Sequence, residues 1–168
     1  MLRGVVILRI EDFIEGSYSS FEAEINLWKK EVELFINTSG NHHISEDLFE
    51  DIIRIISFVD ENKSIIQETL FKDDILELAE NITSSATFLE CSSNECYMLD
   101  DGSKVHFPIT KDDFFNSLYI ESLTINFNKD NYSFIELILL NNPDYFNGSY
   151  FIINIDENNN IEFIGSKD

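Results

Sequence analysis

Cysteine, proline and glycine are scarce in this sequence of 168 residues, which holds two, two and six of them respectively. Two cysteines are too few for a disulfide framework, so the sequence favours a cytoplasmic protein with reduced thiols. The few prolines and glycines leave little material for linkers or low-complexity tails. Because 15 Phe and 6 Tyr can supply a core, we expect residues 1–168 to form a single globular domain.

Basic residues are also few, since 11 Lys and Arg stand against 32 Asp and Glu and the formal net charge is −21. Such a chain repels nucleic-acid phosphates and anionic membranes, and it carries no basic cluster to overcome that repulsion. No apolar run is long enough to cross a bilayer. We therefore expect no direct nucleic acid and no membrane among its partners. A basic protein is the partner that electrostatics favours, although the same charge also serves ordinary solubility.

Alternation of apolar and polar residues predicts strands at both ends of the chain. Gly4–Ile10 is expected to be a first strand. Phe21–Ile25 and Val32–Ile36 alternate apolar residues with glutamates, and a turn around Leu27–Lys30 joins them as a hairpin. Four further strands with short turns predict an antiparallel meander. They are Ile120–Phe127, Tyr132–Leu140, Tyr150–Ile155 and Ile161–Ile164.

Helical spacing dominates the middle of the chain. Ser45 is the expected N-cap of a first helix, with acidic residues in its first turn. The second helical region runs over Glu61–Asn81, and its pattern allows a break near Lys72–Asp74. Both helices are expected to pack on one sheet face. Their candidate core positions are Leu48, Phe49, Ile52, Ile53, Ile55, Ile56 and Val59, then Ile65, Ile66, Leu70, Ile75, Leu78 and Ala79.

Two shorter elements precede the meander. Tyr97–Leu99 and Lys104–Phe107 flank good turn residues and predict a small hairpin. Thr110 is the expected cap of a short helix through Leu118, with Asp113 completing a capping box. The sequence therefore predicts an α+β fold with an N-terminal β-hairpin unit, a helical middle and a C-terminal antiparallel β-meander. Whether the strands form one sheet or two stays open.

Metal ligands are poorly arranged in the sequence. Cys91 and Cys96 are spaced C-x4-C, and they lie far from the adjacent pair His42 and His43 and from His106. Without a C-x2-C knuckle we expect no zinc site.

A calcium loop is the second metal site to consider. The run Asp156–Asn160 has the D-x-N-x-N spacing that opens a calcium loop. Ile161 and Lys167 stand where that loop needs Gly and Glu, so we expect an asparagine-rich turn and no cofactor.

Catalytic motifs are missing as well. The glycines are isolated from one another, so no phosphate-binding loop or nucleophile elbow occurs. No pair of carboxylates stands in an apolar setting that would raise a pKa for acid–base work. We expect a protein that is not an enzyme. A small-ligand or catalytic site assembled from scattered residues remains an alternative.

Acidic residues are dense in the helical middle, where residues 46–80 hold 11 acids and 3 bases. Like charges four residues apart destabilise a helix slightly, and we expect Glu50 to pair with Arg54. The remaining acids form either a solvated face or a docking surface for a cationic partner. The candidate partner-binding residues are Glu46, Asp47, Glu50, Asp51, Asp73, Glu77 and Glu80.

Most of the chain, from Phe21 to Gly165, resembles a family of bacterial domains of unknown function. The segments FEAEINLWKKEVELFIN, DDILELAENI, FPITKDDFFNSLYIESLTINFN and PDYFNGSYFIINID carry the resemblance. Members have a tryptophan-bearing hairpin, a helical middle and a C-terminal F-x-G-H run before an apolar strand. Here Phe146-Asn147-Gly148 matches that run, and Ser149 stands where relatives carry histidine, so we expect no imidazole-dependent role there.

The resemblance implies a domain of the kind encoded near bacterial toxin and immunity systems. The function it favours is a cytoplasmic immunity or inhibitor protein that binds a basic toxin. Besides the ligand-binding or enzymatic alternative, an interaction module unrelated to toxins remains open, including a nucleic-acid mimic that displays carboxylates at phosphate-like spacing.

Overall fold

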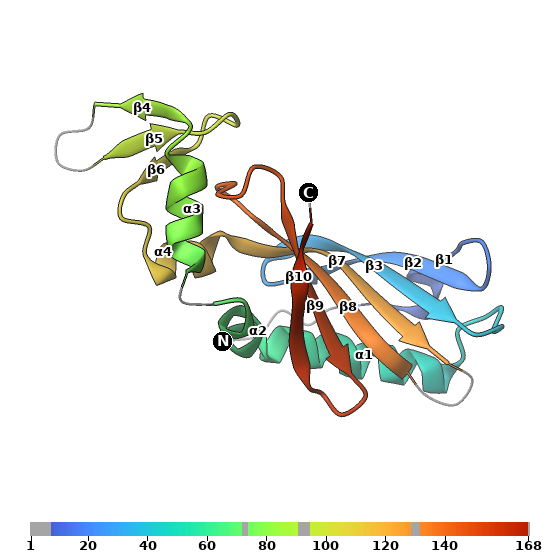
Figure 1. Cartoon of the computed structure of the whole chain (residues 1–168). Helices are drawn as coiled ribbons and strands as arrows, with labels where there is room; N and C mark the ends of the chain where they lie inside the picture. Colours follow the sequence, from blue (N-terminus) through green and yellow to red (C-terminus); the bar gives the residue numbers. More distant parts are fainter. Residues whose placement is uncertain (1–7, 72–73, 91–94, 129–131, 168) are drawn as a thin grey trace, which may run out of the picture.

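The computed structural model describes residues 8–71, 74–90, 95–128 and 132–167 and shows a mixed α+β fold (Figure 1). The described strands are β1 (Ile14–Glu15), β2 (Ser20–Leu27), β3 (Lys30–Thr38), β4 (Thr87–Leu89), β5 (Cys96–Met98), β6 (Lys104–His106), β7 (Leu118–Phe127), β8 (Tyr132–Asn141), β9 (Tyr150–Asp156) and β10 (Ile161–Lys167). The described helices are the 3-10 helix η1 (Ile10–Asp12) and the α-helices α1 (Glu46–Glu61), α2 (Lys63–Leu70), α3 (Ile75–Thr83) and α4 (Lys111–Ser117).

Seven strands form one sheet in the order β1-β2-β3-β7-β8-β9-β10. The predicted N-terminal hairpin is β2 and β3, and the predicted antiparallel meander is β7 to β10. A parallel pair, β3 with β7, joins the two in the register Glu33 to Ser122. Parallel neighbours need a long crossover, and the helical middle of the chain supplies it. A separate three-stranded sheet contains β4, β5 and β6.

One face of the seven-stranded sheet forms the core with α1 and α2, which run along the lower side in Figure 1. Leu34, Leu123 and Leu137 point into this core and are fully buried. The predicted helical spacing of α1 is confirmed, because Ile52 and Val59 are also fully buried. Ser45 caps this helix as predicted, since its hydroxyl oxygen accepts the N–H of Leu48.

The turn of the β2–β3 hairpin is anchored on the helices. Trp28 and Lys29 both have positive φ, at 49° and 68°, as a two-residue type I′ turn requires. The turn holds without glycine because Trp28 is buried: its Nε1–H donates to the Val59 carbonyl at 3.4 Å, and the Lys63 ammonium lies 5.1 Å from its ring centre. These contacts fix the orientation of the hairpin on α1.

The short helix α4 begins as predicted. Asp113 donates its N–H to the Thr110 hydroxyl at 3.1 Å, and its carboxylate accepts the Thr110 N–H at 3.0 Å. Hydrogen bonds from Thr110 lower the pKa of the Asp113 carboxyl. The helix directs Phe114 into the core, where its ring centre lies 6.2 Å from that of Phe146 and 6.4 Å from that of Phe151.

The prediction of a first strand over Gly4–Ile10 is wrong for residues 8–10, which the structure describes. Residues 4–7 lie outside the described part. Leu8 and Arg9 have no regular structure, and Ile10–Asp12 is a 3-10 turn. The Asp12 carboxylate accepts the Arg9 N–H at 2.8 Å. A short acidic side chain that captures the backbone in this way competes with a strand ladder.

The second predicted helical region divides into α2 and α3, and only α2 joins α1 under the seven-stranded sheet (Figure 1). Helix α2 ends at Leu70 and α3 begins at Ile75, and Lys72 and Asp73 of the predicted break lie outside the described residues. Helix α3 stands beside the small sheet, so the prediction that both helical regions cover one sheet face is wrong for α3. Leu78 on α3 is consequently 48% exposed. Ile65 on α2 is 56% exposed, so neither of these two predicted core residues belongs to the core. Strand β4 was not predicted, because three residues are too short for a clear alternation.

In the described part of the chain, no helix combines the length and the apolar character needed to span a membrane.

Candidate functional site

The acidic residues predicted on the first helix lie at its N-terminal half. Glu46, Asp47 and Glu50 are exposed, and Asp51 is half-buried. The predicted pairing of Glu50 with Arg54 is wrong, because Arg54 Nη2 contacts Asp51 Oδ1 at 2.6 Å. These residues form an exposed acidic stripe along α1, and their role as a docking surface stays a prediction.

The other predicted acids do not join that stripe. Asp73 lies outside the described residues, and Glu77 is exposed on α3, beside the small sheet (Figure 1). Glu80 is half-buried and accepts the Ile109 N–H at 2.6 Å, which ties α3 to the segment before α4. Glu80 therefore has a structural role.

The five zinc candidates are not gathered at one place. Cys91 lies outside the described residues. Cys96 is buried in β5 and pairs in register with His106 on β6. His42 and His43 are exposed on the loop between β3 and α1, at the opposite end of the molecule (Figure 1). No group of three potential metal ligands occurs among the residues that the structure describes.

The predicted asparagine-rich turn joins β9 to β10. The Asp156 carboxylate accepts the N–H groups of Asn158 and Asn160 at 2.8 and 2.9 Å, and also the side-chain amide of Asn160. The hydrogen bonds from Asn160 and Asn158 lower the pKa of Asp156. The carboxylate oxygens thus stabilise the turn itself.

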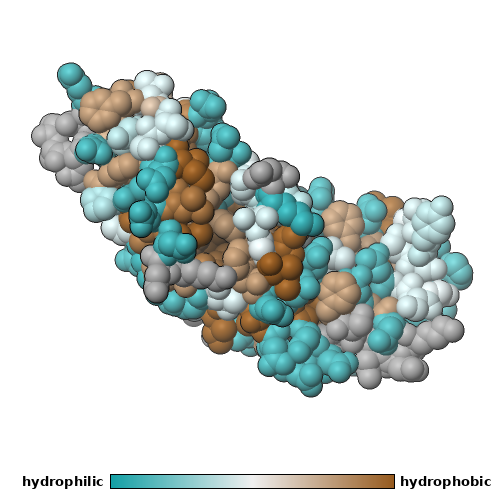
Figure 2. Space-filling model, viewed as in Figure 1, coloured by the Kyte–Doolittle hydropathy of each residue, from teal (hydrophilic) through white to brown (hydrophobic). Residues whose placement is uncertain are grey.

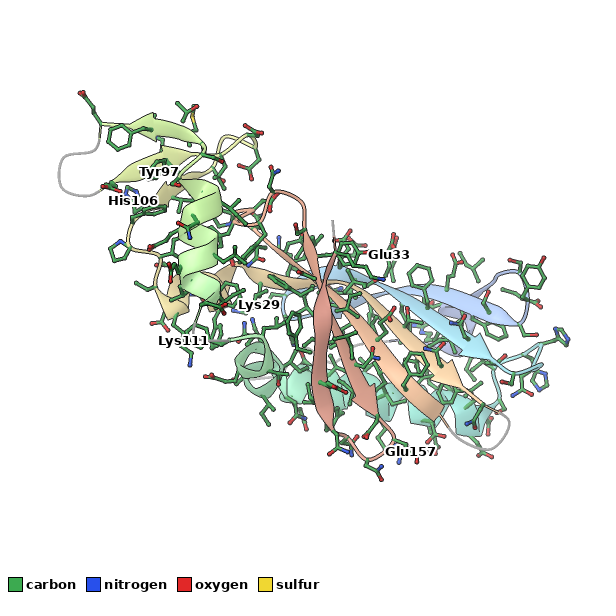
Figure 3. All side chains as sticks on the ribbon, viewed as in Figure 1. Lys29, Glu33, Tyr97, His106, Lys111 and Glu157 are labelled. Atoms are coloured by element: carbon green, nitrogen blue, oxygen red, sulfur yellow. The ribbon has the colours of Figure 1, made fainter. Side chains whose placement is uncertain are left out.

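The outer face of the seven-stranded sheet is the feature that sequence reasoning missed. Helices α1 and α2 cover only the other face, and Glu33 lies on the side of the sheet away from α1 in Figure 3. On β2 and β3, all the glutamates point from this outer face and are exposed. We call them the acidic face, and they are Glu22, Glu24, Glu31 and Glu33.

The acidic face crowds like charges together. Glu24 is directly opposite Glu33 in the hairpin register, and Glu31 is its diagonal neighbour. Hydrogen bonding with Glu31 and the charge of Glu31, followed by desolvation and the charge of Glu33, raise the pKa of Glu24. Like charges directly opposite in a sheet are destabilising.

The ion pairs among the described residues leave the acidic face out. In the part of the chain that the structure describes, the ion pairs join Arg9 to Glu11, Arg54 to Asp51 and Lys111 to Glu68. None of them includes a carboxylate of the acidic face.

One row of outward side chains shows how the outer face changes across the sheet. In register it runs from Glu24 and Glu33 through Ser122 on β7 to Ile138 on β8 and Ile152 on β9. With neighbouring strands about 4.8 Å apart, the row spans about 19 Å. This row is therefore acidic at one end, neutral and polar in the middle, and apolar at the other end, whereas the adjacent outward row runs from Phe35 through Thr124 to Glu136 and Asn154.

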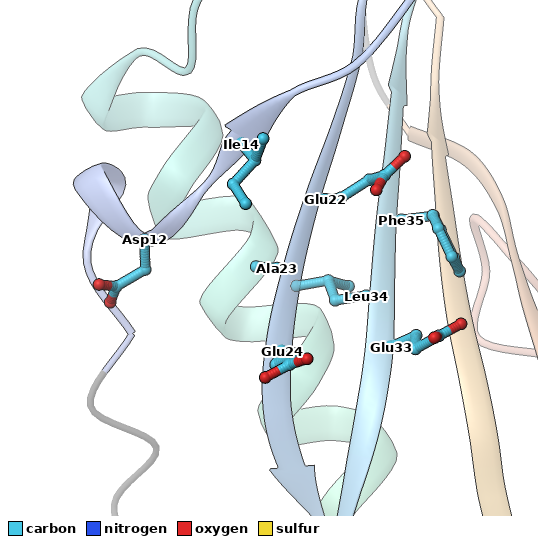
Figure 4. A pocket seen from close by; sticks show the side chains of 8 residues that line it. All are labelled: Asp12, Ile14, Glu22, Ala23, Glu24, Glu33, Leu34 and Phe35. Carbon is cyan, nitrogen blue, oxygen red and sulfur yellow. The ribbon is translucent and has the colours of Figure 1, made fainter.

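A hollow of about 500 Å³ opens on the acidic face (Figure 4). Asp12 and Ile14 form one side, and Glu22, Glu24, Glu33 and Phe35 project in front of β2 and β3, with α1 behind the sheet. Ile14 is 72% exposed. Carboxylates next to apolar groups suit lysine and arginine, which carry a charged end on an aliphatic stem.

A second exposed patch lies on the small sheet and α3, where apolar residues gather at the upper left of Figure 2. Leu78, Phe88 and Met98 are 48%, 57% and 38% exposed. The ring of Tyr97 packs between Phe88 and Phe107, with ring centres 5.6 and 4.7 Å away.

Comparison with known protein families, with curated proteins and with solved structures finds no match to this chain.

The crowding at Glu24 has a consequence for stability. A carboxyl whose pKa is raised on folding destabilises the fold when it is ionised. This destabilisation is complete at neutral pH and disappears below the ordinary pKa of 4.5, where the carboxyl is protonated in both states. We therefore expect Glu24→Gln to stabilise the protein at neutral pH, with a gain that shrinks as the pH falls toward 4.5. Urea unfolding across this pH range measures the effect.

Glu157→Gln is the matched control for this prediction. It removes the same charge at the exposed β9–β10 turn (Figure 3), and we expect a smaller change from it. A gain from Glu24→Gln that is the same at low and neutral pH would show that repulsion is not its cause.

Proposed function

We propose that this chain binds a basic protein through its acidic face, and that it acts in this way as an immunity or inhibitor protein that covers a cationic toxin. One observation carries the proposal: four exposed glutamates without ion-pair partners among the described residues stand together on a sheet face that α1 and α2 leave uncovered. A cationic partner would relieve their mutual repulsion.

Charge supports the recognition step. The net charge of −21 attracts a basic protein at long range, and the acidic face concentrates that attraction at one place. Complementary potentials speed association and discriminate against acidic partners.

An apolar side chain in line with the acidic face supports tight binding. Ile138 is half-buried, lies in register with Glu33 through Ser122 and is accessible to a partner, whereas Ile152 is only 7% exposed and offers little surface. Interfaces gain most of their affinity from a few central side chains from which water is excluded, while charges at the rim act mainly on specificity and rate. The row of outward residues therefore places charged and apolar groups on the same face of the sheet.

The resemblance to domains encoded near toxin and immunity systems supports the inhibitor role and a cytoplasmic location. An immunity protein needs a tight partner surface and no chemistry of its own. The exposed stripe Glu46, Asp47, Glu50 and Asp51 on α1 is the other surface that could serve the same function.

The test is capture from the native cell at low salt with three baits. They are the wild type, the variant with all four acidic-face glutamates replaced by glutamine, and a variant with the four α1 acids replaced by their amides. We expect a basic protein that the wild type and the α1 variant retain and the acidic-face variant loses. Co-expression of that protein with the wild type should then abolish its toxicity.

Equal retention by all three baits, or capture of acidic proteins alone, would contradict the proposal. Loss from the α1 variant alone would transfer the binding site to α1.

A further inference from the structure

Beyond its first residues, the outer edge of β2 pairs with no other strand in the part of the chain that the structure describes. Strand β1 pairs with β2 only at Phe21 and Glu22. Leu27 and Lys30 flank the two-residue turn and form a hydrogen-bonded pair. Every second residue of β2, counted back from Leu27, therefore bonds to β3 through its backbone, and the backbone groups of the residues between them point to the outer edge. The backbone groups of Glu24 and Asn26 therefore face outward, and among the described residues no hydrogen bond satisfies them.

The chain turns away where β1 would otherwise cover this edge. The register Ile14 to Glu22 would place Asp12 opposite Glu24 if β1 continued backwards. Instead Ile10–Asp12 forms the 3-10 turn η1, which is closed by the Asp12 carboxylate on the Arg9 N–H. The hollow of about 500 Å³ lies between this turn and the outer face of β2 (Figure 4).

Charge decides which kind of strand can add here. On a strand added at Glu24 and Asn26, the outward side chain opposite Glu24 would lie about 5 Å from that of Glu24. A second copy of β2 would bring glutamates against glutamates, so self-association at this edge is disfavoured. A strand with lysine or arginine at every second residue would instead meet carboxylates.

The opposite side of an added strand would meet apolar groups. Ala23 points toward the α1 side, is half-buried and packs against the core. Residues between the basic positions would therefore be apolar, and β-branched residues suit an extended strand.

We propose that the partner adds an extended segment to the edge of β2 at Glu24 and Asn26, with basic and apolar residues alternating along it. This inference rests on the proposed function, because it names the binding mode of the same acidic face. Main-chain hydrogen bonds would supply affinity, and the glutamates would select basic side chains.

The test uses a peptide of about eight residues in which lysine and valine alternate, long enough to pair with the open part of β2. A second peptide carries N-methyl groups on its central lysines and valines, which removes the N–H groups that could face β2 in either strand direction and leaves the charge unchanged. We expect the unmethylated peptide to bind the wild type, and the methylated peptide to bind about tenfold or more weakly. The amide NMR signals of Glu24 and Asn26 should shift with the first peptide only.

Two variants with equal charge complete the test. Asn26→Pro removes the outward N–H from the edge, whereas Asn26→Thr retains it. We expect the proline variant to lose about tenfold in affinity for the unmethylated peptide relative to the threonine variant.

Equal binding of both peptides, together with equal affinity of the two variants, would overturn strand addition. If binding still required the four glutamates, the acidic face would stand as the site of the proposed function without strand pairing. If neither peptide bound while a basic protein was still captured through the acidic face, strand addition alone would fail.

Discussion

Replacing Glu22, Glu24, Glu31 and Glu33 together by glutamine is expected to weaken binding of the basic partner about 100-fold, which corresponds to about 2.7 kcal/mol. The four side chains are exposed on one sheet face, and the described ion pairs include none of them. Most of the loss should appear in the association rate, because charges of this kind steer the encounter. Surface plasmon resonance with the captured protein measures both rates.

The control is the variant with the same number of charges removed from α1, at Glu46, Asp47, Glu50 and Asp51. It has the same net charge as the acidic-face variant, so a purely long-range effect would weaken both equally. We expect a loss of less than about fivefold from it. Unfolding cannot explain the larger loss, because removing the repulsion around Glu24 should stabilise the sheet. Equal losses in the two variants would show that only net charge matters.

Phe114→Ala is expected to lower the free energy of unfolding by about 3–5 kcal/mol. Phe114 is fully buried, and its ring packs against those of Phe71, Phe146 and Phe151. It joins α4 to the β8–β9 connection and to β9, so truncation leaves a cavity between elements that cannot close over it. Denaturant unfolding gives the value directly.

Phe88→Ala is the matched control, because this phenylalanine is 57% exposed on the small sheet. We expect it to cost less than about 1 kcal/mol. A similar small loss for Phe114→Ala would mean that the aromatic cluster does not stabilise the fold as its burial implies.

The elements that local chemistry determines could be predicted from the sequence. The caps at Ser45 and Thr110 act within three residues, and the alternation on either side of Trp28 sets both the strands and their turn. The parallel pairing of β3 with β7 could not be predicted, because it joins residues nearly 90 positions apart, such as Glu33 and Ser122. No local pattern specifies a pairing over that distance.

The same limit explains why the candidate site differs from the predicted one. The spacing of the glutamates on β2 and β3 showed a polar face, but a polar face is usually just solvated. What distinguishes it is that α1 and α2 both lie on the opposite face, and that Ile138 and Ile152 continue its row. Both facts depend on the order of strands in the sheet. On α3, by contrast, the sequence pattern predicted Glu80 to be a surface residue that binds a partner, but its carboxylate accepts the backbone N–H of Ile109.

The salt dependence of the association rate tests most directly whether the acidic face recruits a cationic protein. Stopped-flow mixing of the wild type with its captured partner should show a rate constant that falls at least about tenfold between low and high salt, because screening removes electrostatic steering. The variant without the four glutamates should start lower and depend much less on salt. An association rate that does not change with salt, or that changes equally in both proteins, would contradict recognition through this face.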